Sequence, residues 1–254
     1  MTTPVFLSPA LPSELLSYIL NNHVYPTTLI ICYSRAEFLA TVVEDIQKQS
    51  RESVQDSDKL ELHEGGPSQQ APRKESRDVE HILLSSPLYQ VAISRHIRMV
   101  YIPTVTHLRA YLSVFSPDES LVTAPPPAFT GAKHRKPHLL LYGFLELHRD
   151  TSEWSAQGLS NTTAALIEVA HRLSWQALVI EPRGGERGTP LENALRETVP
   201  ILSGGARRLG LDSDEGAWTG RTVEVGRILS RWFSFQRAQW DTDDGPELVE
   251  TTDD

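Results

Sequence analysis

Three short stretches of this 254-residue sequence gather arginine and lysine side chains, which pair with phosphate groups. The first stretch, Glu181–Gly188, is rich in glycine and carries Arg183 and Arg187. Glu181 and Glu186 stand beside these arginines, which is also typical of a solvated loop of mixed charge. We predict nucleic-acid contacts at this stretch and at two others, which hold Lys133, Arg135 and Lys136, and Arg207 and Arg208.

Two of the five tryptophans, Trp154 and Trp218, stand in polar surroundings instead of apolar runs. Tryptophan is enriched at protein interfaces because its ring buries a large area while its N–H group donates a hydrogen bond. We therefore expect Trp154 and Trp218 to contact a partner protein.

The side chains that could act as a nucleophile or a metal ligand are better explained by structure. Ser34 lacks the G-x-S-x-G surroundings of a hydrolase nucleophile, and with Glu37 it has the spacing of a helix capping box. Cys32 lies inside an apolar run, which is typical of a small buried side chain. His134 and His138 stand four residues apart without companion ligands. The sequence predicts no catalytic residue, no metal and no cofactor.

A nucleotide phosphate loop requires the pattern G-x-x-x-x-G-K-[ST] between a strand and its helix, so that backbone N–H groups and a lysine surround the phosphates. The junction Cys32–Glu37 contains neither glycine nor lysine, and the pattern occurs nowhere else in the chain. The third strand pattern should end in a magnesium-binding acid, but it ends in Leu141-Tyr142-Gly143-Phe144. ATP hydrolysis is therefore not expected, and we predict that the protein is not an enzyme.

Short apolar runs that alternate with helical spacing indicate a parallel sheet. Four runs are continuous enough to be strands buried on both faces: 27–33, 97–102, 139–144 and 176–180. Helical spacing follows Ser34, follows a cap at Thr104 or Thr106, and continues from about Ser160 to Leu173. This order predicts an α/β fold with helices on both faces of the sheet.

The last third of the sequence has a different pattern. Residues 198–202 and 206–211 look extended, and 222–235 alternates apolar with charged residues. Such alternation is typical of antiparallel strands with one solvated face. We predict antiparallel strands appended to the C-terminal end of the parallel sheet.

Composition and charge predict one folded domain over about 1–240. The formal net charge is −9, and the acidic stretch 241–254 contributes seven acids and no base, so we expect a disordered tail after a nearly neutral domain. The polar stretch 50–78 is predicted to be a disordered insert, and the proline-rich, basic stretch 116–137 a long loop. A single cysteine excludes an internal disulfide framework and favours the nucleus or the cytosol.

Four segments together resemble a divergent, fungal RecA-like protein: His138–Phe144, Leu159–Leu173, Ala177–Glu181 and Gly220–Phe233. The layout over about 25–240 is similar to that of the recombinase paralogs, including small non-catalytic subunits of the Shu type. Both nucleotide motifs depart from those of the active family. The resemblance implies a three-layer RecA-like domain, a P-loop NTPase-like fold that acts as a pseudo-ATPase.

The resemblance also implies a setting and partners. It implies a nuclear subunit of a heteromeric complex in homologous recombination or DNA repair, bound to other recombinase-paralog subunits and to DNA. In that family the loops after the third and fourth strands face DNA, which here are about Glu146–Gln157 and Glu181–Leu195. The first loop carries His148 and Arg149 beside acidic residues, whereas the second carries Arg183 and Arg187.

Three alternatives remain open from the sequence. The accessory RecA-like subunits of the Elongator complex have the same layout, lack standard nucleotide motifs and form a ring that handles tRNA, which would place the protein in the cytoplasm. A small-molecule transferase could assemble a site only in three dimensions. A scaffold without nucleic acid is favoured if the basic loops lie on different faces of the molecule.

Overall fold

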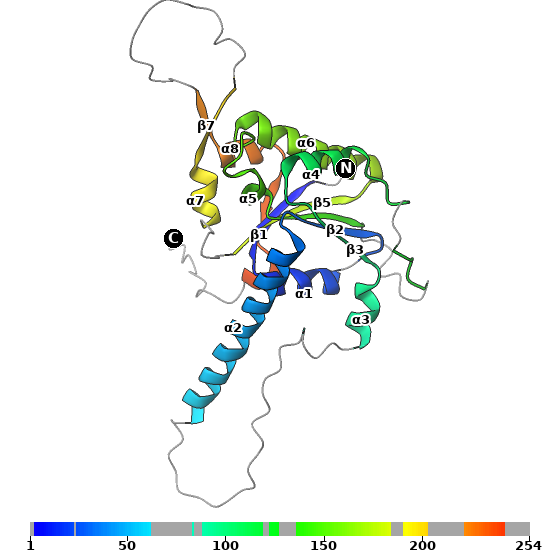
Figure 1. Cartoon of the computed structure of the whole chain (residues 1–254), viewed down its shortest axis with the longest axis vertical. Coiled ribbons are helices and arrows are strands. Elements are labelled where there is room, and N and C mark those ends of the chain that lie inside the picture. The colour runs from blue at the N-terminus through cyan, green and yellow to red at the C-terminus, as the bar shows by residue number, and fades with distance from the viewer. Residues whose placement is uncertain are drawn as a thin grey trace, which may run out of the picture.

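The structure, a computed structural model, describes residues 3–22, 24–61, 83, 88–118, 122–126, 136–183, 190–202 and 221–241, with only the backbone described in 52–61. A sheet of six parallel strands lies at its centre (Figure 1). The strands lie in the order β3-β2-β4-β5-β1-β8. Their bounds are β1 Val5–Ala10, β2 Thr27–Ile31, β3 Ile97–Tyr101, β4 His138–Tyr142, β5 Gln176–Pro182 and β8 Ser234–Gln236.

Helices cover both faces of this sheet (Figure 1). One face packs against α1 (Pro12–Asn22) and α2 (Arg35–Glu61). The opposite face packs against α4 (Val105–Ser113), α5 (Phe144–His148), α6 (Ala156–Leu173) and α8 (Val225–Leu229). The remaining helical elements are α3 (Leu88–Ser94), which contacts α1, α7 (Leu191–Arg196), which contacts α8, and the 3-10 helix η2 (Gln239–Asp241).

The central strands β2, β4 and β5 are largely apolar because they are buried on both sides. In β2, Leu29 and Ile31 face α1 and α2, whereas Ile30 belongs to the cluster under α4 and α6. Successive side chains of a strand point to opposite faces, so a sheet covered twice requires an unbroken apolar run. The prediction of an α/β fold with a parallel sheet is therefore confirmed.

The helix starts follow the predicted capping residues. Ser34 accepts a hydrogen bond from the backbone N–H of Glu37, and the Glu37 carboxylate accepts one from the N–H of Ser34. Thr104 caps α4 by accepting from the N–H of His107 at 3.2 Å. Helix α6 begins at Ala156, earlier than predicted, because Ser155 caps it through the N–H of Gly158.

The sequence interpretation missed the first strand and its helix. Strand β1 lies between β5 and β8, and Ser8 and Pro9 interrupt its apolar run after Leu7, so no long apolar run marks it. The strand predicted as the first is therefore the second in the chain. The first strand–helix junction is Ala10–Pro12, which also contains neither glycine nor lysine.

The prediction of antiparallel strands in the last third is confirmed, but their attachment to the parallel sheet is not. The antiparallel pair, β6 (Thr198–Pro200) with β7 (Thr222–Glu224), forms a separate sheet, and β8 joins the main sheet parallel to β1. Between β7 and β8 the chain forms α8, because Val225, Ile228 and Leu229 are buried together at helical spacing. Residues 206–211 lie outside the described residues.

Helix α2 also continues into a stretch predicted to be disordered. It ends at Glu61, so the backbone of 50–61 is helical where a disordered insert was predicted. Residues 62–78 lie outside the described residues. The described parts of 116–137 contain no helix or strand, and the loop prediction for this stretch stays a prediction. Of the tail, Asp241 ends η2, and 242–254 lie outside the described residues.

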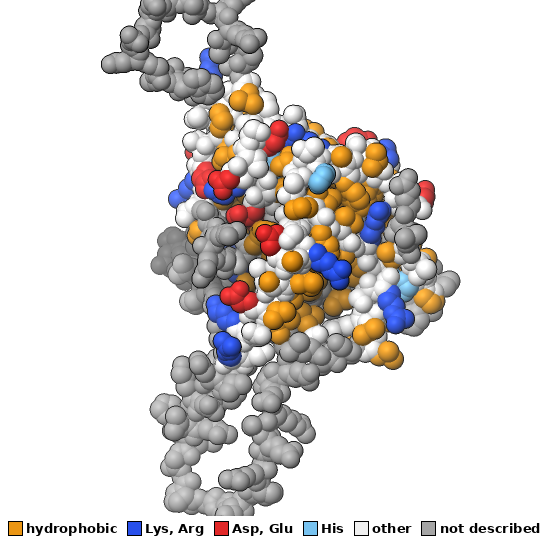
Figure 2. Space-filling view, viewed as in Figure 1, with side chains coloured by type: hydrophobic (Ala, Val, Ile, Leu, Met, Phe, Trp, Pro, Cys, Tyr) orange, Lys and Arg blue, Asp and Glu red, His pale blue; other side chains and the backbone are white. Residues whose placement is uncertain are grey.

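Hydrophobic side chains stay exposed on one side of the molecule. Figure 2 shows them gathered over the start of α2 and the neighbouring part of the sheet, where β2 and β3 lie. Leu39 and Val43 of α2 and Met99 of β3 are each at least 40% exposed. Met99 places part of this surface on β3, the strand that forms one edge of the sheet.

Candidate functional site

The carboxyl end of the sheet is the expected ligand site of this fold. Ligands of open α/β sheets bind outside the carboxyl ends of the strands, at the point where neighbouring strands lead their chains in opposite directions. Here β2 leads to β3 on one side, and its neighbour β4 leads to β5 on the other. Tyr33 and Gly143 follow β2 and β4 and therefore mark this point.

The crevice between these two strands holds an aromatic ring of the protein. Gly143 has a left-handed φ of +84°, and a Cβ atom added there would lie 2.5 Å from Cε2 of Tyr33. Burial, followed by the nearby Glu181 carboxyl, raises the pKa of Tyr33 above its usual range. The Tyr33 ring thus lies directly on the backbone where a ligand would approach.

The N-terminus of α5 is capped by the buried carboxyl group of Glu181, which lies near the end of β5. Glu181 is 5% exposed, and its Oε1 accepts a hydrogen bond from the N–H of Leu145 at 2.9 Å. Burial, reinforced by the charge of Glu146, raises the pKa of Glu181 to about 8, against the opposing effect of its backbone hydrogen bonds. Glu181, expected in a solvated loop, is instead an internal cap.

The N-terminus of α1 is capped by two more carboxylates. Asp45 of α2 accepts a hydrogen bond from the N–H of Ser13 at 2.9 Å, and Glu14 accepts one from the N–H of Leu11 at 2.8 Å. The amide of Gln49 donates to Ser13 Oγ and to Asp45 Oδ1. These backbone N–H groups are the ones that would face a phosphate after the first strand.

Side-chain oxygens therefore cap the four helices that come next after β1, β2, β3 and β4. Carboxyl groups serve α1, α2 and α5, and the Thr104 hydroxyl serves α4. A helix N-terminus attracts anions through its free N–H groups and its dipole. At this end of the sheet, groups of the chain itself already satisfy that attraction.

Arg183, the first predicted nucleic-acid contact, is bound within the chain. Its Nη1 lies 3.1 Å from Oε1 of Glu14, and its Nη2 lies 3.6 Å from Oδ1 of Asp241. Its Nε donates to the carbonyl of Pro9. The guanidinium group joins the end of β5 to α1 and η2 and is compensated by two carboxylates.

The structure does not bring the described basic candidates together. Lys136 is exposed and precedes β4, so it lies at the amino end of the sheet, whereas Arg183 follows β5 at the carboxyl end. The β4 strand between these ends is about 16 Å long. The other candidates stay predictions because they lie outside the described residues: Lys133, Arg135, Arg187, Arg207, Arg208 and Trp218.

The loop after β4 is occupied by internal contacts. Arg149 Nη1 donates to both carboxylate oxygens of Glu197, at 3.0 and 2.9 Å. The Arg149 guanidinium also lies 4.9 Å from the ring centre of Trp154, which is partly buried against the core. Trp154 thus contacts its own chain, and its predicted contact with a partner is limited to the part of the ring that remains exposed.

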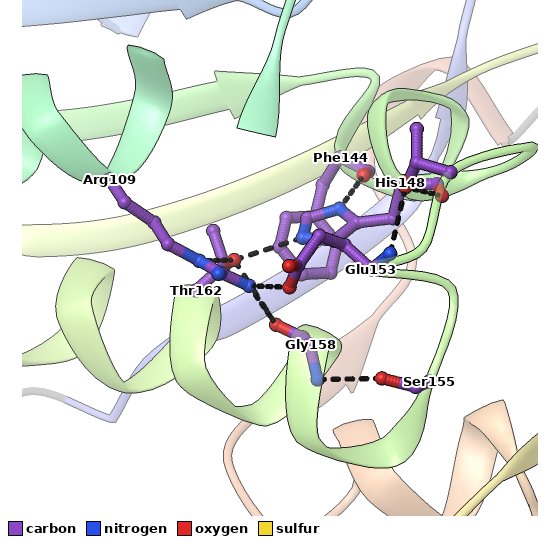
Figure 3. A network of polar contacts seen from close by, with 8 residues as sticks. Arg109, Phe144, His148, Glu153, Ser155, Gly158 and Thr162 are labelled. Carbon is purple, nitrogen blue, oxygen red and sulfur yellow. Dashed lines mark hydrogen bonds and ion pairs between the residues drawn. The ribbon is translucent and has the colours of Figure 1, made fainter. Parts of the chain in front are cut away.

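A buried polar network under α4 and α6 escaped the sequence interpretation (Figure 3). His148 Nε2 lies 2.9 Å from Thr162 Oγ1, and His148 Nδ1 lies 2.8 Å from the carbonyl of Phe144. Because Nδ1 donates to a carbonyl, Nε2 accepts from the Thr162 hydroxyl. Arg109 donates from Nε to Thr162 Oγ1, and from Nη2 to Glu153 at 2.5 Å and to the Gly158 carbonyl.

This network contains a hydroxyl paired with an imidazole, as nucleophilic catalysis requires. His148 and Thr162 are both 0% exposed, so a substrate in solution does not reach them. Burial lowers the pKa of His148 to about 4, which keeps the ring neutral. The network joins α4, α5 and α6, and no local spacing indicates it because the pair is fourteen residues apart.

Two further searches concern the described residues. In these ranges no group of three or more His, Cys, Asp or Glu side chains is placed to hold a metal ion. Among the helices of the same ranges, none has the length and apolar character needed to cross a membrane. No family model matches the chain, and no curated protein or solved structure is significantly similar to it.

Proposed function

We propose that the protein is a non-catalytic RecA-like subunit that binds other RecA-like subunits in homologous recombination or DNA repair. The observation that carries the proposal is the internal capping of α1, α2 and α5 by the protein's own carboxyl groups. An active subunit uses the carboxyl end of its sheet to hold nucleotide phosphates. In this subunit, side-chain carboxyl groups of the chain itself occupy the helix N-termini that would otherwise bind phosphate. The fold then serves to bind other subunits.

Electrostatics support the loss of nucleotide binding. A phosphate oxygen at the N-terminus of α1 would meet Asp45 and Glu14 at contact distance. Two like charges about 4 Å apart repel by roughly 4 kcal/mol at the effective dielectric constant near a protein surface. The junction Ala10–Pro12 offers no lysine in compensation. The resemblance in layout supplies the recombination setting, and the separation of Lys136 from Arg183 favours assembly over DNA contact by that pair.

A nucleotide-binding measurement tests the non-catalytic part. Purified protein is titrated with a fluorescent ATP analogue and magnesium, and ATP hydrolysis is measured in parallel. We expect no saturable binding and no turnover. Hydrolysis that Ser13→Ala abolishes, while the matched change Ser94→Ala leaves it intact, would overturn the proposal, because Ser13 lies at the first strand–helix junction and Ser94 ends α3.

Affinity capture with mass spectrometry tests the partners. Recovery of recombinase-paralog subunits supports the recombination setting. Recovery of Elongator subunits would contradict that setting and move the same fold to tRNA modification. Recovery of neither set would overturn the assembly role and favour a small-molecule site.

A further inference from the structure

The outer edge of β3 leaves a row of backbone groups without a neighbouring strand. The N–H of Ile102 donates to the carbonyl of Ile31, which shows the side of the strand that faces β2. Peptide groups alternate sides along a strand, so Ile97, Met99 and Tyr101 direct their N–H and C=O groups away from β2. Within the described ranges no strand pairs with this side.

Exposed apolar side chains surround the same edge. Six of the nine large hydrophobic side chains that are exposed in the described residues belong to α2, α3 and β3. They are Leu39, Val43, Leu88, Tyr89, Val91 and Met99. An exposed edge strand with apolar flanks is a template for pairing with another chain, and soluble proteins usually protect it.

Two of these exposed apolar residues, Leu39 and Val43, lie on α2, which packs on the sheet through Phe38. The Phe38 ring contacts Tyr101 of β3 and Tyr142 of β4, with ring centres 6.1 and 6.0 Å apart. At about 100° per residue, Leu39 and Val43 lie about 100° and 140° around the helix from Phe38. They are therefore exposed on the side of α2 that does not cover the sheet.

The sequence of β3 is complementary to itself in one antiparallel register. Only residues whose peptide groups point outward can form hydrogen-bonded pairs, so Met99 faces Met99 while Ile97 faces Tyr101. This register places Arg98 opposite Val100. A shift that centres the pair on Arg98 would put two arginines directly opposite each other, which destabilises a sheet.

We propose that two copies of the chain pair through β3, antiparallel and centred on Met99, so that two six-stranded sheets become one continuous sheet. The two-fold axis runs perpendicular to the sheet, since this arrangement keeps Met99 of both copies on the α2 face. This inference goes beyond the proposed function, because it names a second copy and does not depend on other subunits.

Cross-linking tests the register directly. Met99→Cys places one thiol from each copy at the two-fold axis, and a short bis-maleimide should link them into a covalent dimer. The native thiol gives little background because Cys32 is 4% exposed. The matched control is Val114→Cys, which is 70% exposed at the end of α4 and should link far less. Equal linking of the two variants would overturn the proposal.

Sedimentation velocity of the full chain tests the interface. The unmodified protein should form a dimer, and Met99→Asp should raise the dimer dissociation constant on the order of a hundred-fold or more, because two carboxylates meet on the axis. Val114→Asp should leave it unchanged. Circular dichroism checks the fold, and Met99→Lys is a second variant at the same position if Met99→Asp unfolds. A monomeric unmodified protein, or a dimer that persists in both surface variants, would overturn the proposal.

Discussion

The carboxyl end of the sheet and the outer edge of β3 differ in where their polar groups find partners. At the carboxyl end, Asp45, Glu37 and Glu181 accept hydrogen bonds from the helix starts. At β3, the outward peptide groups of Ile97, Met99 and Tyr101 have no strand beside them in the described ranges. The first region is satisfied from within the chain, and the second is not.

This difference separates two uses of one fold. Backbone N–H and C=O groups require partners, whether these come from the chain, from water or from another molecule. A region that supplies its own acceptors loses its capacity for an anionic ligand, whereas an unpaired edge keeps its capacity for another strand. The proposed dimer therefore uses the edge of the sheet and leaves the usual ligand end aside.

The largest expected effect comes from Gly143→Ala, which changes the carboxyl end. The positive φ disfavours any Cβ, and the added atom would overlap the Tyr33 ring. Strain and overpacking together should lower the free energy of unfolding by about 3 kcal/mol in urea denaturation. In the control Tyr33→Ala/Gly143→Ala, relief of the overlap should recover part of this loss. Full stability of the single variant would show that this end is loosely packed.

Glu181→Gln tests the buried cap through its pH dependence. The folded pKa of Glu181, about 8, lies above the ordinary value of 4.5, so the folded state binds more protons between these values. Its contribution to stability is therefore present below pH 4.5 and is lost as the pH rises through 8. The neutral glutamine should remove this loss, which thermal unfolding of both proteins at several pH values measures. Identical pH profiles would contradict the assignment.

His148→Gln is expected to act in the opposite direction. The folded pKa of His148, about 4, lies below the ordinary value of 6.5, so the unfolded state binds more protons between these values. Stability should fall as the pH drops from 6.5 towards 4, and glutamine, which does not titrate, should lack this fall. The matched control is His107→Gln at the exposed start of α4. The stability of this variant should fall at low pH as much as that of the unmodified protein.

Asp45→Ala should have a smaller effect on the same end of the sheet. It removes the acceptor of Ser13 N–H and one partner of Gln49, which should cost about 1.5 kcal/mol of unfolding free energy. Asp45→Asn, which keeps an acceptor oxygen, should cost less. Neither variant should bind ATP, since no lysine is present at Ala10–Pro12. Saturable binding to Asp45→Asn would show that the carboxylate alone blocks the site.

The smallest expected effect comes from Val43→Ser on the open side. Val43 is 53% exposed, so its loss should change the unfolding free energy of the isolated chain by less than about 0.5 kcal/mol. Chemical denaturation at low protein concentration measures this. The buried counterpart Leu108→Ser on α4 serves as the contrast and should be strongly destabilised. A large effect of Val43→Ser would place this flank in the core.

Sequence patterns within a few residues correctly predicted the buried strands and the helix starts. The apolar run of β2 follows from burial on both faces, and the pair Ser34–Glu37 follows from the N–H groups that every helix start exposes. Strand β1 could not be recognised this way because Ser8 and Pro9 interrupt its apolar run. The helical spacing of Val225, Ile228 and Leu229 was present, but it was interpreted as strand alternation.

The features of the site arise from contacts between distant segments. Asp45 caps a helix start thirty-two residues earlier, and Glu181 caps one thirty-six residues earlier. Arg183 was predicted to contact nucleic acid, yet its partners in the structure come from α1 and η2. Local periodicity carries no information about such pairs. The sequence therefore predicted most helices and strands, but not the hydrogen bonds and ion pairs between them.

The position of β1 has a consequence for synthesis on the ribosome. Val5 pairs with Leu178 on one side and with Ser234 on the other. At roughly 5–20 residues per second, about 10–30 s pass before β5 emerges to join β1. During that time the apolar residues of β1 wait without either neighbour, so the nascent chain depends on protection from aggregation. The strand that is made first is thus among the last to enter the sheet.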